Sequence, residues 1–268
     1  MPLPLPSLTP HRLSARLRRW SCLASLLTLA ACAAPPSPPA EPDPTEPIAH
    51  STSRDPAPPS FHDFRPSLHG FRFRNGFQGR IVGTGENSYG LCGGMSFAAA
   101  DFFLARRPIP PDTTPPADGT PLHRYLFTRQ SVSFGTLGAM GLKFVEWMRL
   151  PDDGPDGAHA RTLAALPAIT RTLSRGEPVI LGLVLVRADG RAKAWDNHQI
   201  LALAAAPDGS SIRIYDPNFP RRDDITISIR HQGNSTTIRQ HIPGRADIPV
   251  RGLFHMPYSP SVPPAIPQ

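Results

Sequence analysis

Three residues of this chain carry side chains that together could perform nucleophilic chemistry: Cys92, His198 and Asp216. A thiolate attacks carbonyl carbons, and an imidazole can take the thiol proton and later return a proton to a leaving amine. A carboxylate beside the imidazole holds it in one tautomer and stabilises its charged form. The chemistry that these residue types suggest is thiol-dependent attack on an amide.

Cys92 lies in the segment YGLCGGMSF, directly before an apolar run with helical spacing. At the first turn of a helix, unpaired backbone N–H groups and the positive end of the helix dipole stabilise a thiolate. Gly90, Gly93 and Gly94 leave little side-chain bulk around the sulfur, so we expect that a substrate backbone could approach closely.

Cys92 is also the one thiol that an exported form of this chain would retain. Cys22 lies inside an apparent export signal, and Cys32 ends a segment typical of lipid attachment. Disulfide bridging is the usual use of cysteine outside the cytoplasm, and a lone cysteine has no partner for an internal bridge. Reactivity is therefore the leading interpretation of Cys92.

His198 and Asp216 are predicted to lie on neighbouring antiparallel strands. A turn near residues 207–209 would pair the strand after His198 with the strand before Asp216, which puts His198 opposite about residue 217 to 219. Asp216 then falls in the diagonal range of roughly 7–8 Å between backbone positions. Asn218 projects from the same face and is the alternative partner for the imidazole.

Each of these residues also has a plain structural interpretation. Cys92 alone could be a small buried residue, His198 is one of ten histidines, and Asp216-Pro217-Asn218 alone is a good turn. The order of the three types, each in a suitable local setting, favours a catalytic dyad or triad over chance.

The segments Gly-Leu-Cys-Gly-Gly-Met, Asn-His-Gln-Ile-Leu-Ala and Ile-Tyr-Asp-Pro-Asn resemble those of bacterial papain-like cysteine peptidases, including the C39-like branch. The resemblance covers about residues 87–220. It implies an α+β, papain-like fold in which the helix that carries the nucleophile packs on an antiparallel sheet. It also implies that Cys92 is the nucleophile, His198 the general base and acid, and Asp216 the orienting group.

Enzymes of that family usually carry a glutamine about six residues before the cysteine, and its amide completes the oxyanion hole. That position here is Glu86, whose ionised carboxylate cannot donate a hydrogen bond. Asn87, one residue later, can donate, so we take Asn87 together with the backbone N–H of Cys92 as the candidate donors.

The elements that must position these residues are helices first and strands afterwards, which indicates an α+β domain and not a βαβ alternation. Helical spacing predicts helices over 92–106, 122–130 and 161–175, and Pro167 inside the last predicts a kink or a later start. Residues 135–148 are ambiguous. Strands are expected over 71–77, 178–186, 198–206, 211–215, 224–231, 236–242 and 251–256.

The first 31 residues are predicted to be a lipoprotein signal peptide. A basic region free of acids precedes the apolar run of residues 22–31, which is shorter than the ~20 residues that span a bilayer. Leu29-Ala30-Ala31-Cys32 resembles a lipobox, which implies a lipid on Cys32. An ordinary secretory signal is the alternative, and Arg18-Arg19 leaves twin-arginine export open.

After Cys32, the composition predicts a Pro-rich disordered tether over 32–63, a papain-like catalytic domain over 64–256 and a disordered tail over 257–268. We therefore expect a location in the bacterial cell envelope, lipid-anchored and facing the periplasm or exterior. Without residues 1–31 the chain has 24 basic and 21 acidic residues, a net charge of +3, and no basic stripe that would favour nucleic-acid binding.

We expect no cofactor and no metal, since the chain has no His-Glu-x-x-His segment and no cysteine cluster. The expected partners are a peptide or other amide substrate and a membrane, the latter through the lipid. A membrane-anchored cysteine peptidase is the leading hypothesis. The alternatives are an acyltransferase or cell-wall amidase with the same triad, and an inactive papain-like binding lipoprotein.

Overall fold

A computed structural model describes residues 57–79, 88–233 and 235–266. The chain divides into two units, Met1–Arg54 and Asp55–Gln268, and all the described residues belong to the second. The predicted signal peptide and the lipid-attachment residue Cys32 lie outside the described residues, as does most of the predicted tether. Among the described helices, none combines the length and the apolar character that crossing a membrane requires.

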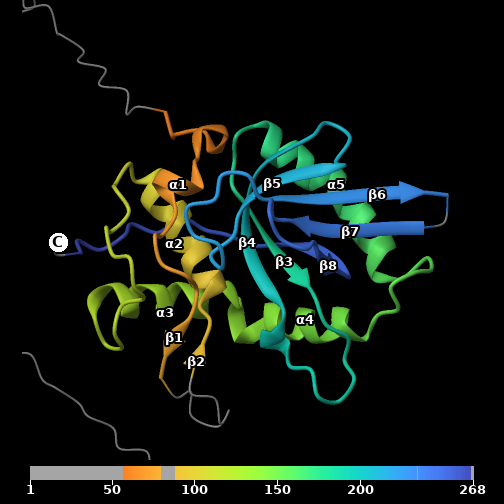
Figure 1. Ribbon diagram of the computed structural model, residues 1–268, viewed down its shortest axis with the longest axis horizontal. Helices are drawn as coiled ribbons and strands as arrows, with labels where there is room; N and C mark the ends of the chain where they lie inside the picture. The colour runs from red at the N-terminus through yellow and green to blue at the C-terminus, as the bar shows by residue number, and fades with distance from the viewer. Residues whose placement is uncertain (1–56, 80–87, 234, 267–268) are drawn as a thin grey trace, which may run out of the picture. The chain divides into compact units, whose positions relative to one another are not determined.

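The fold is α+β, as the sequence predicts, with a seven-stranded antiparallel sheet in the described part of the chain (Figure 1). The order of its strands is β8-β7-β6-β5-β4-β3-β9. These strands are β3 (Val179–Val184), β4 (His198–Ala205), β5 (Ser211–Tyr215), β6 (Thr226–Gln232), β7 (Ser235–His241), β8 (Ile248–Val250) and β9 (Gly252–Met256). A separate antiparallel pair is formed by β1 (Phe77–Gln78) and β2 (Ser88–Tyr89).

Helices cover both faces of the sheet. The longer ones are α2 (Cys92–Leu104), α3 (Pro121–Ser133), α4 (Ala139–Arg149) and α5 (Ala158–Ser174). The shorter ones are α1 (Pro66–His69) and the 3-10 turns η1 (Phe61–Asp63), η2 (Thr136–Gly138) and η3 (Ala194–Asp196). α2 packs on β4 and on α3, whereas α5 packs on β9, β4 and β3 (Figure 1).

The two faces of β3 belong to two different hydrophobic clusters. Ile180 and Val184 pack in the cluster that contains the apolar residues of α2, α3 and α4. Val179, Leu181 and Leu183 pack in the cluster that contains those of α5. Because successive side chains of a strand point to opposite faces, a strand buried on both faces must be apolar throughout. This burial explains the continuous run of apolar residues along β3.

The helices agree with the prediction in place but not at every boundary. α2 begins at Cys92 as predicted and ends at Leu104, two residues before the predicted end, and α3 covers its predicted range. The ambiguous segment contains α4, with Phe144 and Trp147 buried. α5 begins at Ala158, before the predicted start, and contains Pro167. The expectation of a later start was therefore wrong. Pro167 is exposed, and the buried residues Leu166 and Ile169 on either side of it hold the helix against the sheet.

The predicted strand over residues 71–77 does not form. Phe71, Phe73 and Phe77 are buried, so the alternation of apolar residues was real, but it packs an irregular segment into the core. The Phe71 N–H donates to the Tyr215 hydroxyl at 3.3 Å, and the Asn75 N–H donates to a backbone carbonyl in the turn after β5. Among the described residues of this segment only Phe77 enters a strand, β1, where it pairs with Tyr89.

The C-terminal tail, expected to be disordered, packs on α2 and α3 where the structure describes it. The Tyr258 hydroxyl and the Ser261 N–H donate to Oδ1 of Asp101, at 2.9 and 2.8 Å. Asp101 is buried in the last turn of α2, and it also forms an ion pair with Arg129 of α3 at 2.7 Å. A buried carboxylate needs such partners, and the tail supplies two of them.

Candidate active site

Cys92 is the first residue of α2, as predicted, and it is a partly exposed free thiol. α2 is apolar along most of its length, and ten of its thirteen residues are buried between the sheet and α3. The core therefore fixes the helix on all sides. Both ends of the helix are partly exposed, through Cys92 at the first turn and through Phe103 and Leu104 at the last.

Two glycines after Cys92 allow α2 to approach its neighbours. A Cβ at Gly94 would lie 2.1 Å from the backbone oxygen of Leu126 in α3, and a Cβ at Gly93 would lie 2.2 Å from Oε1 of Gln199 in β4. Neither distance is possible for a real side chain. The expectation that these two glycines open space for a substrate is thus corrected: the protein's own atoms fill that space.

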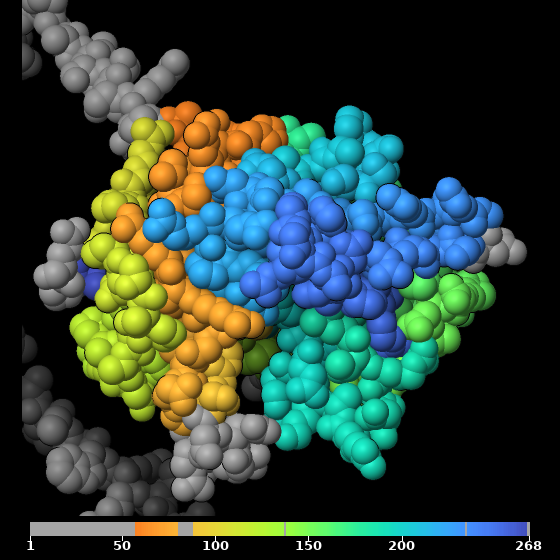
Figure 2. Space-filling view, in the orientation of Figure 1, coloured from red at the N-terminus to blue at the C-terminus, as the bar shows by residue number. Residues whose placement is uncertain are grey.

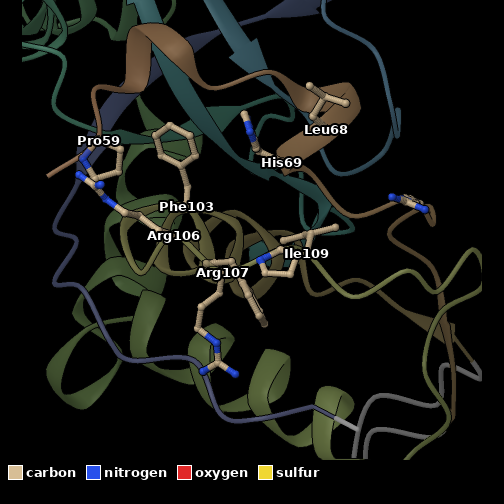
Figure 3. A pocket seen from close by; sticks show the side chains of 10 residues that line it. Pro59, Leu68, His69, Phe103, Arg106, Arg107 and Ile109 are labelled. Carbon is tan, nitrogen blue, oxygen red and sulfur yellow. The ribbon is translucent and has the colours of Figure 1, made fainter. Parts of the chain in front are cut away.

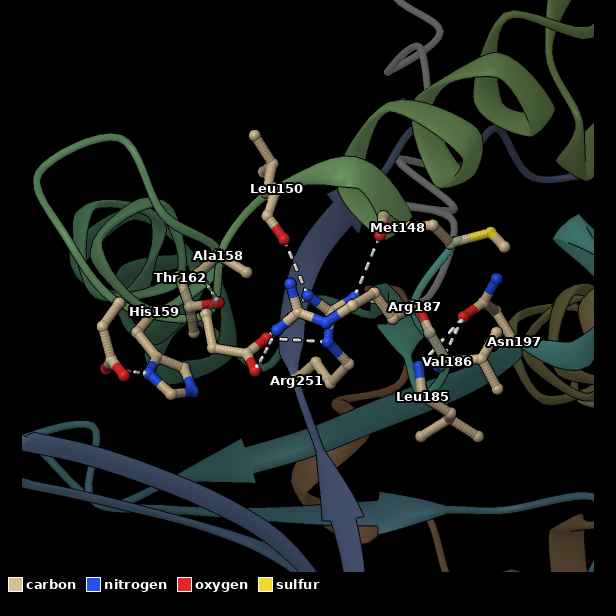
Figure 4. Close-up of polar contacts among 12 residues, drawn as sticks. Met148, Leu150, Ala158, His159, Thr162, Leu185, Val186, Arg187, Asn197 and Arg251 are labelled. Carbon is tan, nitrogen blue, oxygen red and sulfur yellow. Dashed lines mark hydrogen bonds and ion pairs between the residues drawn. The ribbon is translucent and has the colours of Figure 1, made fainter. Parts of the chain in front are cut away.

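His198 is the first residue of β4 and is 5% exposed. The residue before it fixes the entry of the chain into this strand. Asn197 Oδ1 accepts hydrogen bonds from the N–H groups of Leu185 and Val186, at 2.9 and 3.4 Å, just beyond the end of β3 (Figure 4). Arg251 donates to the Val186 carbonyl at 3.0 Å, so the connection from β3 to β4 is held at its start and at its end.

Asp216 directly follows β5, and the register of β4 and β5 brings it to His198. Leu201 pairs with Tyr215, and continuing that register places His198 opposite Asn218. This agrees with the sequence prediction of residue 217 to 219, although a register shift interrupts the pair after Ala202. Oδ1 of Asp216 lies 2.7 Å from Nε2 of His198, which is a hydrogen-bond distance.

Asp216 is 1% exposed, and two more donors reach it. The Asn218 N–H donates to its Oδ1 at 2.8 Å, and Gln240 Nε2 in β7 donates to its Oδ2 at 2.5 Å. Gln240 was missed from the sequence. The pattern of the strand could have indicated it. Every second residue of β7 is buried, and Gln240 is a polar residue on the same buried face as the apolar Ile238.

The charges of the pair stabilise each other. Burial lowers the pKa of His198, but the Asp216 carboxylate and the contact with the Cys92 side chain outweigh it and raise the pKa to about 10. Burial raises the pKa of Asp216, but His198 and the donors from Asn218 and Gln240 hold it below its usual value. Because Nε2 faces Asp216, the imidazole nitrogen left for Cys92 is Nδ1.

Asn75 is a second residue that the sequence reasoning missed, because it lay in the segment expected to be a strand. Its Oδ1 accepts from the N–H of Leu91 at 2.6 Å, one residue before Cys92. Its Nδ2 donates to Oδ1 of Asn218 at 3.1 Å, and Nδ2 of Asn218 lies 3.3 Å from Nε2 of His198. Gly90 makes room for this amide, since a Cβ there would lie 2.9 Å from Nδ2 of Asn75.

The structure thus brings together Cys92, His198 and Asp216, with Asn218 beside them. Glu86 and Asn87, the positions considered for the oxyanion hole, lie outside the described residues. Figure 2 shows a hollow between the segment of β1 and β2 and the connection from β3 to β4. The first of these segments leads into Cys92 and the second into His198.

A cavity of about 480 Å³ lies elsewhere, at the C-terminal end of α2 (Figure 3). Its lining includes Phe103, Arg106, Arg107, His69 and Ile109. Arg106 and Arg107 point in different directions, and each donates to a backbone carbonyl, Arg106 near the start of the described chain and Arg107 in the tail. This cavity is separated from Cys92 by the length of the helix.

In the ranges that the structure describes, no group of three or more His, Cys, Asp or Glu side chains could hold a metal ion. No family model, no curated protein and no solved structure matches this chain.

Proposed function

We propose that this protein is a thiol-dependent amide hydrolase, a cysteine peptidase of papain-like fold, tethered to a bacterial envelope membrane. The observation that carries the proposal is the arrangement around His198. Its Nε2 lies 2.7 Å from a buried carboxylate, and the side chain of Cys92, at the end of a buried helix, contacts the imidazole. Nucleophile, base and orienter in hydrogen-bond reach of one another are the parts that such catalysis needs.

In the proposed reaction, His198 takes the proton of the Cys92 thiol, and the thiolate forms a bond to the carbonyl carbon of the substrate amide. The C–N bond then breaks, and the leaving amine takes its proton from the His198 imidazolium. Water next attacks the thioester, with His198 as the base, which releases the acid and restores the thiol. Asp216 remains ionised throughout and stabilises the imidazolium.

Negative charge develops on the carbonyl oxygen during each attack, and hydrogen-bond donors must meet it there. The N–H of Cys92, at the first turn of α2, is one donor that supports the proposal. Asn87 stays the candidate for the second donor. Replacing it with alanine should lower kcat about 10²–10³-fold, as loss of one such donor does, with a smaller change in KM.

The papain-like part of the proposal rests on the sequence resemblance and on one structural feature. α2 carries the nucleophile and packs on β4, an antiparallel strand that carries His198 and whose neighbour β5 leads to Asp216. The lipid anchor rests on the sequence around Cys32 alone. No feature of the described residues selects a particular substrate.

The test uses a thiol-reactive, activity-based peptide probe on purified protein. Wild-type protein should be labelled at Cys92, and Cys92→Ala should not. On a peptide found by library screening, Cys92→Ala and His198→Ala should each abolish turnover, whereas Asp216→Ala should keep part of it because it only orients the imidazole. Full turnover by Cys92→Ala would overturn the proposal.

A further inference from the structure

We infer that Asn75 is a positioning residue of the site, which sets the orientation of the Asn218 amide and so leaves Asp216 as the acceptor for the imidazole proton. This inference rests on the proposed function for its catalytic meaning. It is carried by two hydrogen bonds that run from the backbone beside Cys92 through Asn75 to Asn218, and by the 3.3 Å approach of the Asn218 NH₂ group to Nε2 of His198.

The series has one possible direction because its first member can only donate. The N–H of Leu91 donates to the side chain of Asn75, so the oxygen of that amide must face Leu91. The NH₂ group of Asn75 is then turned toward Asn218, and it needs an acceptor there. Oδ1 of Asn218, at 3.1 Å, is that acceptor.

The orientation of Asn218 decides what the imidazole meets. With its oxygen turned to Asn75, Asn218 presents its NH₂ group to Nε2 of His198, at 3.3 Å. An NH₂ group cannot accept the Nε2 proton. The carboxylate of Asp216, at 2.7 Å, can accept it, so the proton stays on Nε2 and Nδ1 exchanges protons with Cys92.

Asn75 also joins the two segments that meet at the site. Its side chain holds the residue before the nucleophile, and its N–H donates to the carbonyl of Pro217 at 3.0 Å, between Asp216 and Asn218. The absence of a side chain at Gly90 provides the room for this amide. A change at Asn75 therefore acts on both the cysteine and the histidine side of the site.

The test is the pH profile of Cys92 alkylation by iodoacetamide in the full chain, with labelling at Cys92 quantified by peptide mass spectrometry. Asn75→Ala should slow alkylation at pH 7 about 5- to 10-fold, the equivalent of one lost hydrogen bond, and change the pH profile. Gln232→Ala, an exposed amide at the end of β6, is the matched control and should leave the profile unchanged.

A double variant distinguishes orientation from general support. Asp216→Ala removes the acceptor for the Nε2 proton and should slow alkylation. Asn75→Asp keeps an oxygen for Leu91 but presents a second oxygen to Asn218, so the Asn218 amide turns and offers its own oxygen to Nε2. Asn75→Asp should therefore restore part of the alkylation rate of Asp216→Ala, and Asn75→Ala should not. Adding Asn218→Ala should remove the rescue.

An alkylation profile in Asn75→Ala that matches wild type would overturn the inference, as would equal rates for the two double variants. If Asn75→Ala does not fold, as judged by circular dichroism, a second comparison decides. It compares the alkylation rate of the Asn75→Asp, Asp216→Ala double variant with the rate of the same protein carrying Asn218→Ala. These outcomes are separate from the proposed function. Wild-type protein that shows the expected profile but cleaves no amide would refute the hydrolase and leave the role of Asn75 intact.

Discussion

Gln240 donates a hydrogen bond from β7 to Asp216, which follows β5, so this carboxylate is held by a strand two places away in the sheet. Both side chains are almost completely buried, at 1% exposed each. A buried carboxylate that loses a donor is costly, because water cannot replace the lost bond. The far half of the sheet therefore contributes directly to the site.

Replacing Gln240 with alanine should destabilise the protein by about 1–3 kcal/mol, the usual cost of leaving a buried acceptor unsatisfied. It should also reduce Cys92 alkylation, because Asp216 loses the donor that fixes its second oxygen. Urea unfolding and alkylation kinetics measure the two effects. Thr237→Ala, an exposed change on the same strand, is the control. Wild-type stability in Gln240→Ala would contradict this prediction.

The pair of His198 and Asp216 makes stability depend on pH in two windows. The pKa of His198 is raised from 6.5 to about 10. Its contribution to the free energy of unfolding is therefore complete below pH 6.5 and is lost as the pH rises toward 10. The pKa of Asp216 is lowered, so its contribution is present above its unfolded value of 3.8 and is lost as the pH falls below it.

The measurement is the free energy of unfolding in urea from pH 3 to pH 10, for wild type and for His198→Ala. The variant should lose the decline between pH 6.5 and 10. His241→Ala removes a half-exposed histidine that pairs with Asp247 at 2.8 Å, and it serves as the control. An identical alkaline decline in His198→Ala and wild type would show that other groups cause it.

Two glycines in helices should respond to alanine in opposite directions. Gly94→Ala in α2 places a methyl group 2.1 Å from a backbone oxygen of α3, which should cost at least about 1–3 kcal/mol. Gly141→Ala in α4 meets only Phe134 at 3.8 Å and should stabilise the protein by up to about 1 kcal/mol. Thermal unfolding measures both changes. Equal effects would contradict the close approach of α2 and α3.

Removing the tail after Met256 should destabilise the domain. The truncation takes away the donors of Tyr258 and Ser261, which leaves the buried carboxylate of Asp101 with fewer partners. We expect a loss of about 1–3 kcal/mol, measured by urea unfolding. A chain that ends after Pro264 keeps both donors and is the matched control. The tail has no role in stability if the two truncated chains unfold alike.

The predicted anchor is tested by fatty-acid labelling in a bacterial host. Wild-type protein should incorporate labelled fatty acid and partition into the detergent phase, because several acyl chains anchor a protein stably. Cys32→Ala should lose both properties, whereas Cys22→Ala, which changes the apolar run only, should keep them. Persistence of the label in Cys32→Ala would place the anchor at another residue.

The sequence predicted the parts of this protein that depend on local pattern. The helix at Cys92, the order of helices before strands, and the register that brings Asp216 to His198 all follow from spacing and from one turn. Contacts between distant segments could not be predicted in this way. Gln240 reaches Asp216 only because of the order of strands in the sheet, and Asn75 reaches Leu91 only because its segment is not a strand.

The predicted strand over residues 71–77 illustrates the same limit. Its alternation of buried and exposed residues matches a strand, yet in the described part of the chain only Phe77 at its end pairs with another strand. The tail is the opposite case. Its proline-rich composition suggested no packing, but Asp101 accepts hydrogen bonds from it, and Arg107 and Arg129 donate hydrogen bonds to its carbonyls.

The position of β9 has a consequence for the synthesis of the chain. β3 pairs on one side with β4, which follows it closely, but on its other side with β9, the last strand of the described chain. Leu183 of β3 faces Leu253 across that pair. The sheet therefore lacks this edge strand until β9 has emerged from the ribosome. Until then the edge of β3 that faces β9 stays unpaired, and α2 lies on an incomplete sheet.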